Sequence, residues 1–275
     1  MSKTNLKSYD LRPLWDVILD IYSVFDSVCK KYNLRFCADS GTALGAVRHH
    51  GFIPWDDDFD IQMPRPDYEK FLTVISDELP PNLKWLDRFN CSCYEHGFGK
   101  IIVSDRSVVE RVSAETGLPL SQGIFIDIFP LDGYPDSYFG RIWRKLFNRM
   151  LEFWPIMARI KCLLKFSKDI KLCKIQAHRT MVDIMDRRAK KYPFGSTKFC
   201  VSIGVSRWFD DKPYSYDFFG SPQKAPFDRM SIPLQENVDG YLTTIFGDYM
   251  TEPPIENQHP AHGGGESPLW RFGPL

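Results

Sequence analysis

The sequence predicts an α+β fold, in which a mixed sheet is flanked by helices and is joined by a helical insertion and a helical C-terminal part. Three observations support this. Apolar residues recur every three to four positions across residues 11–32, which is the period of an amphipathic helix. Phe59, Ile61 and Met63 alternate with polar residues, which is the period of a strand. Residues 138–174 are basic and aromatic, and this shift in composition marks an insertion.

The same periodicities place the other elements in order. We expect strands at residues 34–38, 58–63, 82–87, 100–104, 107–112, 123–129 and 199–205. We expect helices at residues 11–32, 42–49, 67–79, 174–192 and 237–248. Residues 131–133, Leu-Asp-Gly, are typical of a turn in which Asp132 has a structural role. Residues 206–224 form an aromatic loop region with glycine and proline.

The chain has 275 residues, which is ample for a buried core. We expect three parts: a catalytic core at residues 1–135, the basic aromatic helical insertion at residues 136–192, and a C-terminal part at residues 193–275 that packs on the core. The 35 basic residues balance the 35 acidic residues. A general nucleic-acid binder is basic overall, so we expect no nucleic-acid partner.

Several patterns bear on location. Seven cysteines without a Cys-x-x-Cys pair indicate a reducing compartment. The first ten residues lack the apolar core of a signal peptide, and no run approaches the ~20 apolar residues of a membrane span. We therefore expect a cytoplasmic protein, either free or at the inner face of the membrane.

The insertion has two interpretations. Residues 138–174 contain ten Lys and Arg residues and two acidic residues, with aromatic residues among them. This composition fits peripheral contact with an anionic membrane surface. Alternatively, it forms a helical hairpin that packs on the sheet and turns a basic face outward.

Four of the five residues from 56 to 60 are aspartates. Two unit charges 4 Å apart near a partly buried surface repel by about 4 kcal/mol, so we expect a compensating cation. On a strand, Asp58 and Asp60 share one face and lie about 6.6 Å apart. Asp56 joins that face, while Asp57 points away. Carboxylate oxygens suit Mg²⁺, with Mn²⁺ as the alternative ion.

Two further features accompany this aspartate strand. Upstream, Gly41 and Thr42 lie in a small-residue segment whose backbone N–H groups can approach a phosphate. Downstream, Asp127 is a third carboxylate on a later apolar strand, between Ile126 and Ile128. Together, a small-residue turn, Asp-x-Asp on a strand and a later strand carboxylate resemble the nucleotidyltransferase fold.

The resemblance narrows to one family. GTALGAVRHHGFIPWDDDFDIQMPRPDYEKF is similar to the signature of the LicD family of phosphocholine transferases, whose relatives include the fukutin-type phosphoribitol transferases. FIDIFPLDG resembles the second block of the family, and YLTTIFGDYMTEPP resembles its weak C-terminal block. The similarity spans about residues 11–254. One departure is Phe246, where the family usually has tyrosine, so a hydroxyl is missing.

The resemblance implies roles for particular residues. The implied catalytic residues are Asp58, Asp60 and Asp127. The implied Mg²⁺ ligands are Asp56, Asp58, Asp60 and Asp127, although Asp127 is alternatively the base that takes the acceptor's proton. The implied substrate-binding residues are Gly41, Thr42, Arg48, Trp55 and Lys100. Arg48 would contact the diphosphate or form a surface ion pair, and Lys100 would contact a nucleotide phosphate or be a solvated strand-end lysine.

The implied activity is metal-dependent transfer of phosphocholine from CDP-choline to a hydroxyl of a cell-surface glycan, with release of CMP. The glycan, a lipopolysaccharide or teichoic acid, is free or lipid-linked. Alternatives are another CDP-alcohol donor such as CDP-ribitol, nucleotidyl transfer, or a non-catalytic membrane-associated scaffold. The aromatic residues at 208–219 would either surround a quaternary ammonium group or form a satellite core.

Overall fold

The computed structural model describes residues 11–91, 94, 96–103, 124–152, 170–202 and 212–260. Within these ranges, side chains are described except at residues 149, 151, 152 and 170–178. The predicted strand at residues 107–112 lies outside the described residues.

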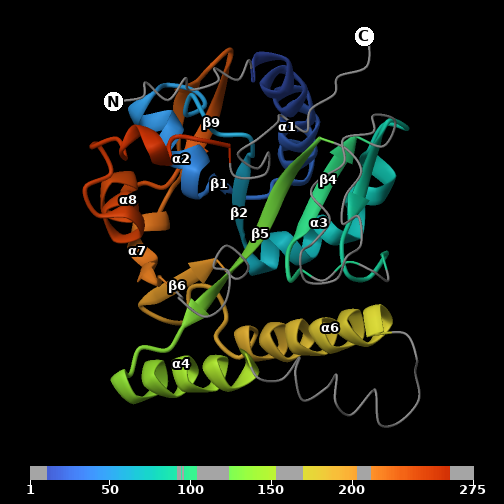
Figure 1. Ribbon diagram of the computed structural model, residues 1–275, viewed down its shortest axis with the longest axis vertical. Coiled ribbons are helices and arrows are strands. Elements are labelled where there is room, and N and C mark those ends of the chain that lie inside the picture. Colours follow the sequence, from blue (N-terminus) through green and yellow to red (C-terminus); the bar gives the residue numbers. More distant parts are fainter. Residues whose placement is uncertain are drawn as a thin grey trace, which may run out of the picture.

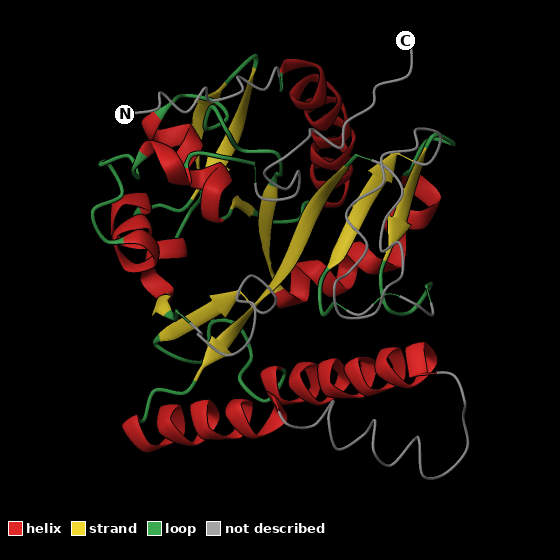
Figure 2. Cartoon of the chain, viewed as in Figure 1, coloured by secondary structure: helices red, strands yellow, loops and turns green. Residues whose placement is uncertain are grey.

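A mixed sheet forms the centre of the molecule (Figures 1 and 2). Its main strands lie in the order β1-β2-β5-β4-β3, and β6 pairs with both β5 and β7. β2 and β5 run parallel, whereas the other pairs are antiparallel. The strands are β1 Cys37–Ala38, β2 Asp60–Pro64, β3 Leu83–Leu86, β4 Gly99–Val103, β5 Phe125–Tyr134, β6 Phe199–Ser202 and β7 Tyr214–Ser215.

Helices flank this sheet, which confirms the predicted α+β class. They are α1 Arg12–Tyr32, α2 Ser40–Arg48, α3 Arg65–Glu78, α4 Tyr138–Glu152, α6 Ile170–Ala189, α7 Tyr216–Phe219 and α8 Val238–Phe246, followed by the 3-10 helix η1 Ile255–Asn257. A separate hairpin consists of β8 Gln223–Phe227 and β9 Met230–Leu234. The expected loop at residues 206–224 was therefore wrong where it includes β7, α7 and the start of β8.

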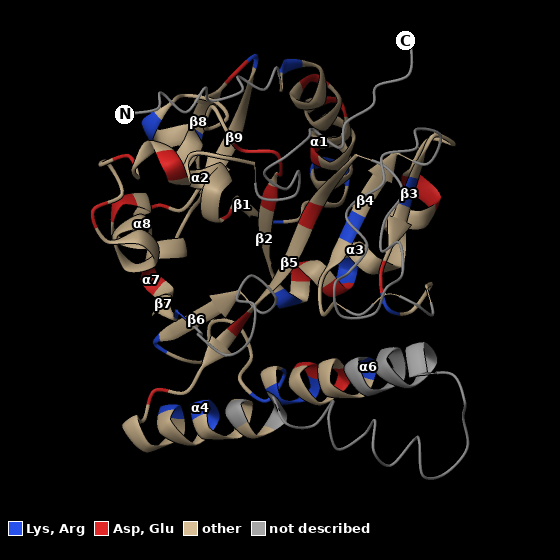
Figure 3. Cartoon of the chain, viewed as in Figure 1, with Lys and Arg blue, Asp and Glu red and all other residues tan. Residues whose placement is uncertain are grey.

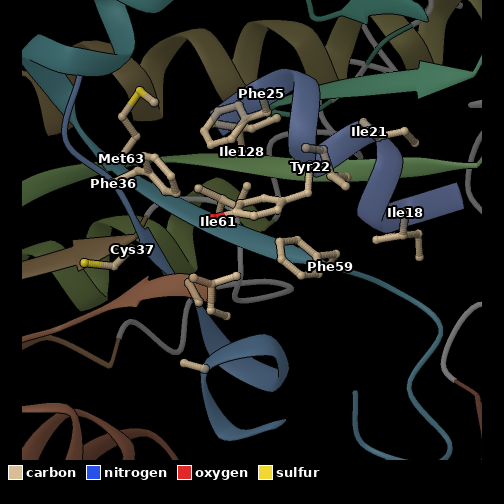
Figure 4. Packing of buried hydrophobic residues seen from close by; sticks show 14 of the residues in the cluster. Ile18, Ile21, Tyr22, Phe25, Phe36, Cys37, Phe59, Ile61, Met63 and Ile128 are labelled. Atoms are coloured by element: carbon tan, nitrogen blue, oxygen red, sulfur yellow. The ribbon is translucent and has the colours of Figure 1, made fainter. Parts of the chain in front are cut away.

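The core lies between α1 and the sheet (Figure 4). Tyr22 of α1 packs its ring 5.2 Å from the ring of Phe59, just before β2. Ile61 and Met63 of β2 are fully buried. Burial of each large apolar side chain contributes about 1.5–3 kcal/mol, so β2 is held firmly in place. This fixes the position of Asp60, the first residue of the strand.

The predicted turn at residues 131–133 was wrong, because β5 continues through it to Tyr134. Asp132 is fully buried in the strand and accepts two hydrogen bonds from the guanidinium of Arg65 on α3. Gly133 permits a close approach rather than a turn. A side chain there would come within 2.7 Å of the carbonyl oxygen of Tyr192.

Helices α4 and α6 form a layer at one end of the sheet (Figure 1). A buried ion-pair network fastens α6 to the sheet. Arg65 Nη1 lies 3.0 Å from Asp186 of α6, and Arg88 Nη2 lies 2.8 Å from the same carboxylate. Since Arg65 also binds Asp132, one arginine connects α3, β5 and α6.

Candidate active site

A cavity of about 730 Å³ lies between α2, the residues before β2, strands β6 and β7, and the region of α8 and the loop after it. Its acidic lining residues are Asp39, Asp56, Asp58, Asp60 and Asp248. Its basic lining residues are Arg48 and Lys212, and its aromatic ones are Trp55, Tyr214, Tyr241, Phe246 and Tyr249. We refer to the acidic set as the acidic wall and to the aromatic set as the aromatic wall, and the two adjoin where Tyr241 contacts Asp39.

The aspartate run faces the cavity in alternation, as predicted. Asp56, Asp58 and Asp60 line the cavity, whereas Asp57 is buried and does not line it. The prediction that Asp58 lies in the strand was wrong, because β2 begins at Asp60. The register with β5 starts at that residue, and the carbonyl oxygen of Phe59 before it accepts a hydrogen bond of 2.9 Å from the backbone N–H of Asp127.

Three charged residues form a row across the sheet. Asp60 of β2 is the register partner of Asp127 on β5, and Asp127 is in turn the partner of Lys100 on β4 (Figure 3). Lys100 Nζ lies 2.9 Å from Asp127 Oδ1 and 3.5 Å from the ring centroid of Phe125. Lys100 and Asp127 are buried and do not line the cavity. The structure therefore brings Asp127 beside Asp60, and Lys100 forms an ion pair with Asp127.

The environment of Asp60 disfavours its negative charge. Burial raises the pKa of Asp60 well above its usual range, and the neighbouring charges of Asp58 and Asp127 raise it further. The charges of Asp39 and Asp56 act in the same direction. This concentration of carboxylates favours a bound cation.

The carboxylates that line the cavity are compatible with a hard cation that has few protein ligands. Among the described residues, no group of three or more Asp, Glu, His or Cys side chains is already arranged to hold a metal ion. The predicted set of Asp56, Asp58, Asp60 and Asp127 is therefore not preassembled. Mg²⁺ typically takes only one or two protein carboxylates and completes its shell with water and phosphate oxygens. Asp58 and Asp60 suit such an ion, because both line the cavity.

The start of α2 supports the acidic wall. Gly41 lines the cavity, and a side chain there would come 2.8 Å from Asp56 Oδ2. Thr42 is buried, and its hydroxyl accepts a hydrogen bond of 2.8 Å from the backbone N–H of Asp60. This hydrogen bond from Asp60 to Thr42 helps to hold the start of the aspartate strand in position. Gly45 permits close packing, because a side chain there would meet the carbonyl oxygen of Gly51.

Arg48 and Trp55 both line the cavity, as expected for substrate-binding residues. Arg48 Nη1 donates a hydrogen bond of 2.8 Å to the carbonyl oxygen of Tyr249. This contact ties α2 to the loop after α8. Trp55 is half-buried, and its ring lies edge-on to that of His49 at 6.3 Å.

Sequence reasoning missed Asp39 and Tyr241, and it did not predict the contacts of Tyr214. Asp39 is 2 % exposed and accepts a hydrogen bond from the hydroxyl of Tyr241. Tyr214 donates to Gln62 Oε1 at 2.5 Å, and its ring lies 4.8 Å from that of Tyr241. The available signal for Tyr241 was its place at the start of the C-terminal family block. Phe246, which replaces the family's tyrosine, lies at the cavity wall.

The aromatic residues at 208–219 have mixed outcomes. Tyr214 lines the cavity, whereas Phe219 is 2 % exposed and belongs to the core. Trp208 and Phe209 lie outside the described residues. The satellite-core alternative therefore holds for Phe219, and the quaternary-ammonium alternative stays a prediction for Tyr214.

The mixed sheet brings neighbouring aspartates to a cavity, and a helix that begins with small residues lies beside them. This arrangement is typical of a nucleotidyltransferase domain. Residues 33–153 match the family described as LicD/FKTN/FKRP, nucleotidyltransferase domain. This match confirms the resemblance to the LicD family that the motifs predict.

Individual relatives extend the similarity. The chain is 27% identical over 273 residues to the lipopolysaccharide cholinephosphotransferase LicD of Haemophilus influenzae. The aligned region covers 94% of this chain and 97% of that protein. Shorter segments match two uncharacterized proteins. One, of Rickettsia typhi, is 47% identical over 45 residues, covering 16% of this chain and 15% of that protein. The other, of Rickettsia prowazekii, is 54% identical over 37 residues, covering 14% of each chain.

Proposed function

We propose that this chain transfers phosphocholine from CDP-choline to a hydroxyl of a cell-surface glycan and releases CMP. The observation that carries the proposal is the nearly end-to-end similarity to a lipopolysaccharide cholinephosphotransferase. Because that similarity covers 94% of the chain, it extends beyond the matched domain to the C-terminal part, which supplies the aromatic wall of the cavity.

The two walls suit the two ends of phosphocholine and its donor. The five carboxylates that line the cavity exceed its two basic side chains, so a diphosphate needs an accompanying divalent cation to enter. The aromatic wall offers ring faces, and a quaternary ammonium group binds well to such faces. Trp55 directly precedes Asp56 of the acidic wall, and Tyr249 directly follows Asp248 in the loop that Arg48 contacts.

In the proposed reaction, the acceptor hydroxyl oxygen attacks the phosphorus of the phosphocholine unit. The bond from this phosphorus to the bridging oxygen breaks, and CMP leaves with that oxygen. The acceptor's proton passes to a carboxylate of the cavity. The protein contributes mainly by positioning the two oxygens in line and by offsetting charge.

The residues have distinct roles in this proposal. Asp58 and Asp60, with Asp56 beside them, would hold Mg²⁺, which when bound neutralises the diphosphate and the leaving CMP. Arg48 orders the loop that closes the cavity. Asp127, held by Lys100, keeps Asp60 in its register position.

The test is CMP release from CDP-choline, CDP-ribitol and other CDP-alcohols, with and without Mg²⁺, in the presence of a glycan extract. We expect Mg²⁺-dependent release from CDP-choline that Asp60→Asn abolishes. Asp77→Asn is the matched control, because Asp77 is an exposed aspartate on α3 outside the cavity lining. The control should retain full activity.

Other outcomes separate the alternatives. Release of CMP from a different CDP-alcohol would retain the mechanism and change the substrate. Transfer of the nucleotide itself to the acceptor, with release of the alcohol phosphate, would identify nucleotidyl transfer. An absence of turnover with every donor would overturn the proposal in favour of a membrane-associated scaffold.

A further inference from the structure

Helix α4 exposes an apolar stripe that the described residues do not cover. Among the described residues, ten large hydrophobic side chains are exposed, and six of them belong to this one helix. They are Tyr138, Phe139, Ile142, Trp143, Leu146 and Met150, with exposed fractions from 37% to 81%. Their spacing follows successive helical turns, so they share one face.

The opposite face of α4 packs against the protein through buried polar groups and through Phe147. Arg144 and Asn148 are buried, and the Arg144 guanidinium lies 4.7 Å over the ring of Tyr134. Arg188 of α6 lies 3.7 Å over the ring of Phe147. A helix of a globular protein normally turns its apolar face to the core, and α4 does the reverse. The described part of the chain therefore leaves this apolar face uncovered.

Charge indicates what that partner is. The segment at residues 138–174 has ten Lys and Arg residues against two acidic residues, while the whole chain has no net charge. Lys145 is exposed on α4, and other basic positions follow along α4 and α6 (Figure 3). Aromatic and aliphatic side chains flanked by basic residues suit the headgroup boundary of an anionic bilayer.

The geometry agrees with a helix that lies on a surface. α4 has 15 residues, about 22 Å at 1.5 Å per residue, which is shorter than a membrane span. None of the helices in the described part of the chain is long and apolar enough to cross a bilayer. α4 also lies at the outer edge of the molecule (Figure 2).

A second copy of this chain is a less suitable partner for the stripe. A symmetric dimer would bring the same patch together from both copies. Lys145, the exposed basic residue described on α4, would then come close to its copy, and like charges across an interface are unfavourable.

We infer that α4 is a membrane-docking helix, whose apolar stripe enters the headgroup region of a bilayer that contains anionic phospholipid. The inference concerns a surface outside the cavity, so it does not depend on which donor the enzyme uses.

The test is flotation of the full chain with vesicles of phosphatidylcholine alone or of phosphatidylcholine mixed with phosphatidylglycerol. We expect binding to the mixed vesicles that decreases with added salt. Trp143→Glu should weaken this binding about tenfold or more, because it places a charge where an aromatic ring would be buried. Lys145→Glu should weaken it several-fold.

Phe89→Glu is the matched control, because Phe89 is 72% exposed but lies outside α4. It should bind like the wild type, and all three glutamate variants should keep the wild-type unfolding temperature. The inference is overturned if the wild type does not float with anionic vesicles, or if Trp143→Glu floats equally well. Light scattering that shows a dimer which Trp143→Glu dissociates, without vesicle binding, would identify a second copy as the partner instead.

Discussion

Asp60 and Asp127 are direct register partners on the parallel strands β2 and β5, and only Asp127 has a lysine as its next neighbour in the row. The ion pair with Lys100 offsets the charge of Asp127 inside the protein. Asp60 has no such partner in that row and faces the cavity. The sheet therefore leaves uncompensated negative charge at the cavity, where the proposed cation and donor bind.

Replacement of Lys100 should destabilise the protein. Lys100→Met leaves the buried Asp127 carboxylate without its ion-pair partner, and loss of one partner of a buried pair costs about 3–5 kcal/mol. Chemical denaturation should show this as a lower midpoint. Lys84→Met is the control on the adjacent strand β3, where the side chain is exposed, and it should change stability by less than about 0.5 kcal/mol.

Asp60→Asn should stabilise the protein while it removes activity. The pKa of Asp60 is raised in the folded state above the ordinary value of 3.8, so the folded state retains a proton that the unfolded state has lost. Stability from this group is therefore present at low pH and is lost as the pH rises above 3.8. We expect the unfolding temperature to fall less in Asp60→Asn than in the wild type as the pH rises above 3.8. A wild-type unfolding temperature that is independent of pH would contradict this account.

Divalent cations should act through the same residue. Mg²⁺ that binds only the folded protein raises its unfolding temperature, by mass action. We expect this increase in the wild type and in Asp77→Asn but not in Asp60→Asn. An equal increase in all three proteins would place the cation elsewhere.

The Arg65 network should be important for stability. Arg65→Met leaves the buried Asp132 carboxylate without the guanidinium that donates to it, and it removes one of the two arginines that contact Asp186, so it should cost about 3–5 kcal/mol. Arg35→Met is a suitable comparison, because Arg35 pairs with Asp67 while its side chain remains 53% exposed. Such a surface pair is worth about 0–1 kcal/mol. Equal losses in the two variants, measured by denaturant unfolding, would contradict the network's importance.

The aspartate strand, its alternation and the amphipathic helix α1 were predictable from sequence, because local periodicity determines which side chains share a face. The partner of Asp127 was not predictable. Lys100 meets it only through the register between β4 and β5, and sequence patterns do not show that pairing. The role of Asp132 was mistaken for the same reason, because Arg65, which binds it, is far away in sequence.

The aromatic wall was also beyond local patterns. Tyr214 and Tyr241 come together from β7 and α8, and neither segment has a periodicity that indicates a cavity. The hairpin of β8 and β9 was missed because Pro226 and Pro233 interrupt its strands, and proline within a run argues against a strand.

Strand β5 connects the aspartate row to the helical layer, since it carries Asp127 near its start and ends at Tyr134, just before α4. Those seven residue steps span up to about 23 Å at ~3.3 Å per residue. If α4 rests on a bilayer, the strand acts as a spacer that sets the height of the cavity above the headgroups. The enzyme would then select acceptors by reach, favouring a hydroxyl on an outlying sugar over one on a sugar next to the lipid.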